Sequence, residues 1–160
     1  MSEPVEILIK RMTAIVRGRE SAKGFHFFCQ IGDKSWDKGV TTLQISGTGW
    51  TLLSRHAIND EGEEIEDMLF SVYLSARDVR ALVRILLDHP FWEFDTSRWE
   101  RKGEETNIHL RVADTGKAFA WGAQYWSSEL DRQPRVRALM STINLIVKTV
   151  SEGQITILGL

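Results

Sequence analysis

The sequence has few of the residues that build disulfide-stabilised or membrane proteins. Cys29 is the one cysteine among 160 residues, so no disulfide can form within the chain, and this usage is typical of a reducing compartment. No apolar run approaches the roughly 18 residues that a transmembrane helix needs. The first residues carry early acidic side chains and lack the pattern of a signal peptide. We therefore expect a cytoplasmic protein with no membrane partner.

The chain also lacks a net charge that would attract a polyanion. Its formal charge is −2 at pH 7, so we expect no nucleic-acid partner. Its three prolines do not gather in a linker, and the sequence contains no internal repeat. Apolar residues at 42% and charged residues at 26% are typical of a globular protein. At this length we expect one domain over residues 1–160, with a core of its own.

The clearest predicted element is a central helix over residues 75–89. Ser75 and Asp78 have the spacing of a helix cap and its reciprocal partner, and Pro90 ends the helix. One apolar stripe recurs at helical spacing: Val79, Leu82, Val83 and Leu86. The aromatic residues that follow are expected to be buried: Phe91, Trp92 and Phe94. This helix is a scaffold around which a sheet would pack.

Two more helices are predicted near the ends of the sequence. Residues 4–17 fit a helical stripe but also alternate in part as a strand would, so we leave both open and favour the helix. A C-terminal helix over residues 134–152 starts near a proline and ends before Gly153. The tail at residues 154–160 either adds an edge strand or stays loose.

Six short runs rich in β-branched and aromatic residues predict strands. They cover residues 25–31, 40–46, 50–57, 68–74, 107–112 and 118–121. Gly47 and Gly49 indicate a hairpin with positive φ, and the run at 68–74 alternates as a strand with one face inside. Because short turns join neighbouring strands, we predict an α+β fold. Its antiparallel sheet has about five to six strands, with helices packed mainly on one face.

The order of these elements over residues 40–150 has a parallel in a known family. Paired strands, a helix ending in a buried phenylalanine, another strand pair and a final helix follow one another. This layout resembles small bacterial α+β domains, among them emfourin-type inhibitors of metalloproteases. The resemblance is one of layout without a shared motif, so no functional residue is carried over from it. It implies a protease-inhibitor-like module as a third candidate function.

Metal, nucleophilic and phosphate sites are all disfavoured by the residue patterns. His26 and Cys29 form an H-x-x-C pair, but residues three apart on a strand point to opposite faces, and no second cysteine exists. Cys29 lies among phenylalanines, where a free thiol behaves as a small apolar side chain. The Gly47–Gly49 turn lacks the helix and lysine of a phosphate loop. We therefore expect no metal and no cofactor.

An acidic stretch and an aromatic group are the candidate surfaces. The acidic residues are Asp60, Glu61, Glu63, Glu64, Glu66 and Asp67. They fit a solvated strand connection, a docking surface for a basic partner, or pairing with the basic segment at residues 10–23. The sequence is rich in tryptophan, with six in all. The aromatic group joins two of them to a tyrosine and two arginines: Arg98, Trp99, Arg101, Tyr125 and Trp126. Hairpin geometry brings these five residues to the end opposite the Asp114–Gly116 turn.

Trp, Tyr and Arg dominate binding hot spots, which makes the aromatic group a candidate binding surface. The alternative is that its rings fold back as a lid on the core; Trp50, Trp92 and Trp121 are expected in the core itself. We favour a non-enzymatic domain that binds a protein, a peptide or its own copy through this surface. The alternative function is a small enzyme or ligand-binding protein whose aromatic pocket holds His56 or His109.

Overall fold

A computed structural model describes residues 3–33, 39–95, 105–114, 117–126 and 132–157. For residues 117–126 it describes the backbone. The elements in chain order are α1 (Glu3–Val16), β1 (His26–Asp33), β2 (Val40–Ser46), β3 (Trp50–Ile58), β4 (Glu64–Tyr73), α2 (Ala76–Asp88), the 3-10 turn η1 (Phe91–Glu93), β5 (Glu105–Asp114), β6 (Lys117–Trp126) and α3 (Pro134–Val150).

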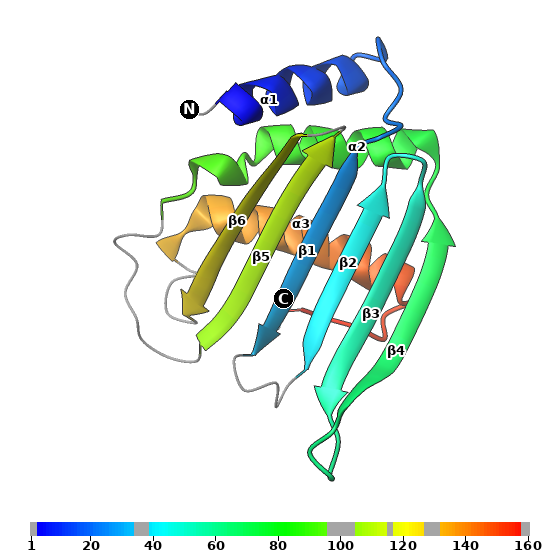
Figure 1. Ribbon diagram of the computed structural model, residues 1–160, viewed down its shortest axis with the longest axis vertical. Coiled ribbons are helices and arrows are strands. Elements are labelled where there is room, and N and C mark those ends of the chain that lie inside the picture. The colour runs from blue at the N-terminus through cyan, green and yellow to red at the C-terminus, as the bar shows by residue number, and fades with distance from the viewer. Residues whose placement is uncertain (1–2, 34–38, 96–104, 115–116, 127–131, 158–160) are drawn as a thin grey trace.

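The six strands form one antiparallel sheet in the order β4-β3-β2-β1-β5-β6 (Figure 1). Tight turns join β2 to β3 and β5 to β6, because neighbouring antiparallel strands need few connecting residues. Two strands far apart in sequence, β1 and β5, pair in the interior of the sheet, with Cys29 opposite Leu110. The predicted α+β fold with an antiparallel sheet is confirmed.

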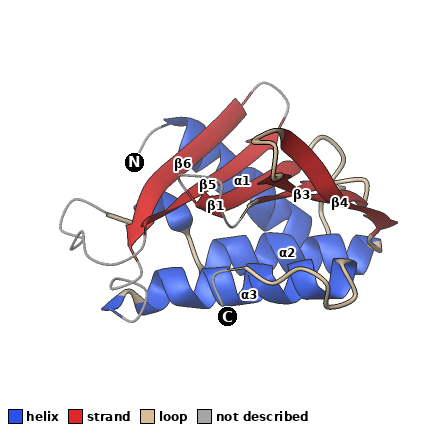
Figure 2. Cartoon of the chain, turned by 90° about the horizontal axis from the view of Figure 1, so that it is seen from below, coloured by secondary structure: helices blue, strands red, loops and turns tan. Residues whose placement is uncertain are grey.

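The predicted helices form, and α1 settles the open choice at residues 4–17 in favour of a helix. At the start of α2, the Ser75 hydroxyl accepts a hydrogen bond from the Asp78 backbone N–H at 3.1 Å, as the spacing predicted. Figure 2 shows α2 and α3 side by side below the sheet. Helix α1 contacts α2, β5 and β6, and Figure 1 shows it across the ends of the last two strands.

The core lies where the apolar stripes of the helices meet the inward side chains of the central strands. From β1, β2 and β5 it takes Phe27, Cys29, Ile31, Leu43, Ile45, Ile108, Leu110 and Val112. The whole predicted stripe of α2 is buried. Phe91 follows this helix, is fully buried, and packs edge-to-face on Trp92 with 5.4 Å between ring centroids. The predicted aromatic plug after α2 therefore closes the core.

Several predictions about the strands need correction. Trp50 is not in the core: it is 42% exposed, because its position on β3 faces away from the helices. The face of β4 expected inside is only half-buried, since β4 is an edge strand. Both β4 and β6 are longer than predicted, so Glu64–Asp67 and Tyr125–Trp126 belong to strands and not to connections. These strands extend beyond their apolar runs because strand pairing uses backbone hydrogen bonds, which polar residues also form.

The tail after α3 forms no strand within the described residues, but Ile155 and Ile157 are buried in the core. The buried side chain of Asn144 on α3 accepts a hydrogen bond from the Ile157 N–H at 2.9 Å. The Ser151 hydroxyl likewise accepts from the Ile155 N–H at 3.0 Å. These bonds turn the chain back along α3, and an apolar pattern alone does not reveal them.

We expect Asn144→Ala to lower the free energy of unfolding by about 1–3 kcal/mol, because it leaves the buried Ile157 N–H without an acceptor. Chemical denaturation monitored by tryptophan fluorescence measures this change. Thr149→Ala, which removes an exposed hydroxyl on the same helix, is the matched control. Equal effects of the two variants would contradict a special role for Asn144.

Candidate functional site

The predicted aromatic surface lies largely outside the described residues. Arg98, Trp99 and Arg101 belong to a segment that the structure does not describe, and so do the side chains of Tyr125 and Trp126. The backbones of the last two pair with Thr106 and Glu105. This is the end of the β5–β6 hairpin opposite its turn, as the hairpin argument required. That the five side chains form a binding surface stays a prediction.

Trp99→Ala tests that prediction directly. If the ring belongs to a binding surface, the variant should associate more weakly with its partner or copy while its stability stays near that of the wild type. Analytical ultracentrifugation and a denaturation curve measure the two quantities. A loss of several kcal/mol of stability, as for a buried aromatic ring, would support the lid on the core instead.

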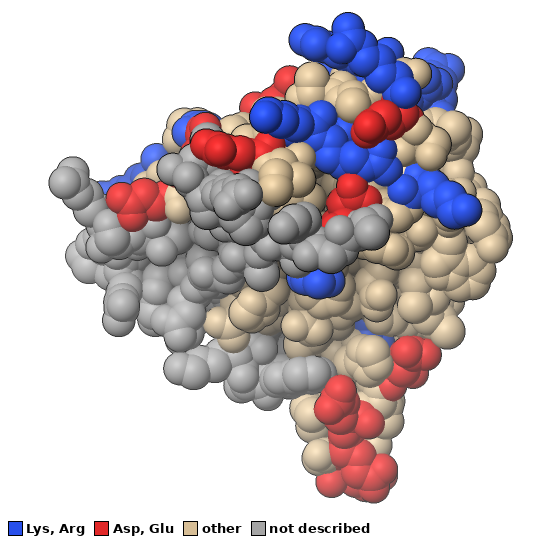
Figure 3. All heavy atoms as spheres, turned by 45° about the horizontal axis from the view of Figure 1, so that its top comes forward, with Lys and Arg blue, Asp and Glu red and all other residues tan. Residues whose placement is uncertain are grey.

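The acidic residues form the tip of the β3–β4 hairpin. The Asn59 side-chain oxygen accepts hydrogen bonds from the backbone N–H groups of Glu61 and Glu63, at 3.1 and 2.8 Å, and so shapes the turn. All six acidic residues are exposed, although the Asp67 carboxylate lies 3.9 Å from Arg55: Asp60, Glu61, Glu63, Glu64, Glu66 and Asp67. Figure 3 shows this acidic projection at the end of the molecule opposite a gathering of lysine and arginine. The tip therefore does not pair with the basic segment at residues 10–23.

Arg11 within that basic segment has partners of its own. Its guanidinium donates to the Asp114 carboxylate at 2.6 Å, to Glu20 at 2.8 Å and to the Lys23 carbonyl at 2.8 Å. Burial lowers the pKa of Arg11, but the bonds and charges of the two carboxylates outweigh it and leave this pKa raised. The cluster fastens α1 to the end of β5. Its function is structural.

The groups with potential for catalysis are separated from one another. His26 is exposed and Cys29 is buried, so the H-x-x-C pair points to opposite faces. His56 lies 3.4 Å from Glu66 on the surface of the sheet, and His109 is exposed on β5, with β2 and β1 between the two strands. Among the described residues, no group of three or more His, Cys, Asp or Glu side chains gathers in a way that could hold a metal ion.

Burial raises the pKa of the Cys29 thiol well above its ordinary value. We therefore expect the native protein to resist a thiol reagent such as DTNB and to react only when denatured. A Ser71→Cys variant, whose new thiol is on an exposed position of β4, should react at once and serves as the control. Rapid modification of the native wild type would contradict the burial of Cys29.

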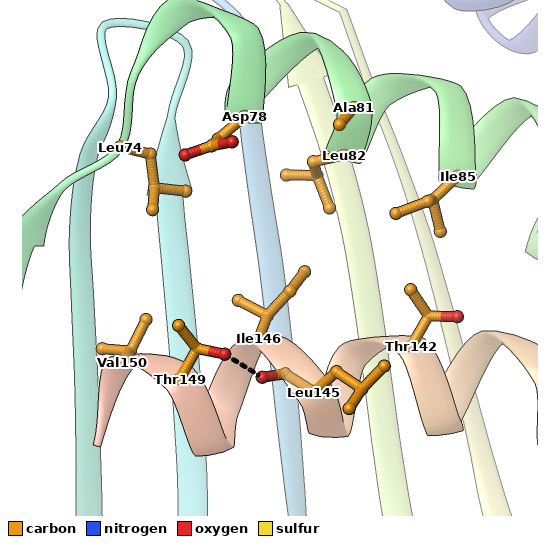
Figure 4. A pocket seen from close by; sticks show the side chains of 10 residues that line it. All are labelled: Leu74, Asp78, Ala81, Leu82, Ile85, Thr142, Leu145, Ile146, Thr149 and Val150. Atoms are coloured by element: carbon orange, nitrogen blue, oxygen red, sulfur yellow. Dashed lines mark hydrogen bonds between the residues drawn. The ribbon is translucent and has the colours of Figure 1, made fainter. Parts of the chain in front are cut away.

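One hollow among the described residues is a groove between α2 and α3, which we call the helix groove (Figure 4). It has a volume of about 340 Å³. Its lining is mostly apolar: Leu74, Asp78, Ala81, Leu82, Ile85, Thr142, Leu145, Ile146, Thr149 and Val150. Figure 4 shows these side chains reaching toward one another from α2 with the preceding Leu74 on one side and from α3 on the other. The groove could hold an apolar segment.

Leu145 marks the rim of the helix groove and is 64% exposed. It lies outside the buried apolar stripe of α3, which consists of Val136, Leu139, Met140, Ile143, Val147 and Val150. An exposed leucine outside such a stripe is the signal by which the sequence could have indicated this site. Asp78 is the one ionisable residue among those that line the groove. No histidine lines it, so the groove is not the predicted pocket with His56 or His109.

A second apolar surface lies on the sheet at β3 and β4, and we call it the sheet-edge patch. It consists of Trp50, Leu69 and Tyr73, of which the last two are 55% and 72% exposed. Trp50 and Tyr73 are opposite each other in the ladder, and their rings pack edge-to-face at 5.3 Å. The patch faces away from α2 and α3. Sequence reasoning missed it because it assigned Trp50 to the core.

No protein-family model and no curated protein matches this chain. Within the described residues, none of the helices combines the length and the apolar character needed to cross a membrane. The resemblance to metalloprotease inhibitors therefore has no support from a sequence match, and it stays an expectation about layout.

Proposed function

We propose that this protein is a non-enzymatic interaction domain that binds an amphipathic helix of a protein partner in the helix groove. The observation that carries the proposal is the apolar lining between α2 and α3, open to solvent with Leu145 exposed at its rim. Side chains from two neighbouring helices provide a channel into which the apolar face of a third helix fits.

The charge of the groove defines the partner further. Asp78 is the single ionisable group in the lining, and its carboxylate lies in the first turn of α2. A partner helix with a lysine or arginine beside its apolar face would pair with this carboxylate. Such a pair adds orientation more than affinity, because it is partly exposed. The expected ligand is thus an apolar helix that carries at least one basic residue.

A peptide selection tests the proposal without a known partner. A displayed library of random helical peptides is selected on the immobilised protein, and the enriched peptides are measured by fluorescence anisotropy. We expect apolar residues at positions i, i+3 or i+4 and i+7 with a basic residue beside them. Leu145→Asp should weaken these peptides about tenfold or more, because it places a charge where an apolar side chain docks.

Leu69→Asp is the matched control for this experiment. It makes the same change at an exposed leucine of the sheet-edge patch, on the other side of the sheet from the helix groove. Circular dichroism verifies that both variants fold. A selection that enriches no helical pattern, or peptides that bind Leu145→Asp as tightly as the wild type, would reject the helix groove as the binding site.

A further inference from the structure

We infer that β4 pairs antiparallel with β4 of a second copy of this chain, forming a two-fold symmetric dimer with one continuous sheet. Within the described sheet β4 has β3 as its single neighbour, and Figure 1 shows it as the outermost strand on its side. Exposed edge strands present unpaired backbone groups to any other extended chain. The inference uses a surface separate from the helix groove and does not depend on it.

Every second backbone N–H group of residues 69–73 points away from β3, as such pairing requires. The Leu74 N–H donates to the Gly49 carbonyl at 2.8 Å, toward β3. Because successive residues of a strand alternate in direction, the N–H groups of Leu69, Ser71 and Tyr73 point outward, away from β3. Within the described sheet, these three N–H donors and the carbonyl acceptors of the same residues therefore have no neighbouring strand on the outer side of β4. This is the pattern that a second strand needs.

The side chains of the same segment favour burial. Residues 68–73 contain no charged residue and no proline, and they are rich in strand formers. On one face, Leu69 and Tyr73 are largely exposed. On the other, Met68, Phe70 and Val72 are half-buried and pack against the core. A second β4 would extend both faces at once and cover apolar surface on each.

The charges at the two ends of β4 favour a second copy of this chain in antiparallel orientation. The first half of β4 is acidic, with Glu64, Glu66 and Asp67, whereas the exposed Arg77 comes just after its other end. Antiparallel pairing centred on residues 68–73 directs the acidic half of each copy toward Arg77 of the other. Parallel pairing would instead set acidic residues beside acidic residues. Two-fold symmetry makes the favourable contact twice.

The first test is the oligomeric state of the full chain by sedimentation velocity over a wide range of concentration. We expect a concentration-dependent dimer. Ser71→Pro removes an N–H group that points toward the second copy, and Leu69→Asp places a charge in the apolar interface between the two β4 strands. Each variant should raise the dimer dissociation constant about tenfold or more. Leu145→Asp, in the helix groove, should dimerise as the wild type does. A monomeric wild type, or a dimer unaffected by both β4 variants, would overturn the inference.

A charge variant and a cross-link test the orientation. Arg77→Glu should weaken the dimer, whereas Arg84→Glu, further along the exposed face of α2, should leave it unchanged. Because Cys29 is buried, a cysteine introduced at position 69, 71 or 73 is the reactive thiol of its variant. At least one of these should form a disulfide-linked dimer on mild oxidation, and Leu145→Cys should not. Cross-linking at position 145 but at none of the β4 positions would contradict pairing through β4.

Discussion

Replacing Phe91 with alanine is expected to lower the free energy of unfolding by about 3–5 kcal/mol. The ring is fully buried after α2, and it packs edge-to-face on Trp92 at 5.4 Å. Removing it forfeits the transfer energy of the ring and leaves a cavity between helix and sheet. Small domains have a total stability of about 5–15 kcal/mol, so this single change consumes a large part of it. Denaturant titration with fluorescence and circular dichroism measures the loss.

Phe94→Ala is the matched control for this variant. Its ring is only half-buried, and Arg135 lies over it at 5.8 Å from the ring centroid. Removing the Phe94 ring should lower the free energy of unfolding clearly less than removing the Phe91 ring, because less apolar area leaves the core. If the two variants are equally stable, Phe91 does not occupy the central position that its burial indicates.

Gly49→Ala is expected to destabilise the protein by about 3 kcal/mol or more. Gly49 has a φ of 99°, which alanine adopts with strain. A Cβ at this position would also lie 2.2 Å from the Leu74 carbonyl oxygen, where β3 and β4 meet. Relief of that contact requires the backbone to move and endangers the bond from the Leu74 N–H to the Gly49 carbonyl. Thermal unfolding measures the result.

Gly62→Ala separates the two causes. Gly62 also has a positive φ, of 79°, but nothing lies within 4 Å of an added Cβ. It should therefore show the backbone strain alone, about 1–2 kcal/mol. If Gly49→Ala lowered the stability no more than Gly62→Ala does, the backbone at Leu74 would move aside easily, and its close approach to position 49 would have little effect on stability.

The predictions from sequence succeeded where a pattern is local. The cap at Ser75 and the stripe of α2 follow from residues within one helix, and the structure confirms both. The alternation of residues 107–112 likewise placed Ile108, Leu110 and Val112 inside. Gly49 has the positive φ expected in the hairpin, but the same expectation for Gly47 is wrong. Glycine is required at position 47 for a different reason, since a Cβ there would lie 1.7 Å from the Ala22 carbonyl oxygen.

The candidate surfaces were harder to predict, and Trp50 shows why. An aromatic residue in an alternating strand has the same sequence pattern at the centre of a sheet as at its edge. Its burial depends on what covers that face, and α2 and α3 lie on the other side. Leu145 is comparable, since the helix groove is formed by two helices that are more than forty residues apart in the chain.

The amino-acid sequence by itself determined the helices, most strands and the antiparallel α+β class, because periodicity and turn residues act over a few positions. The tertiary structure decided the strand order, the edge position of β4 and the groove between α2 and α3. These features depend on contacts between distant segments, above all the pairing of β1 with β5 in the interior of the sheet. Local patterns state that a side chain is apolar, but the packing of remote elements decides whether it is covered.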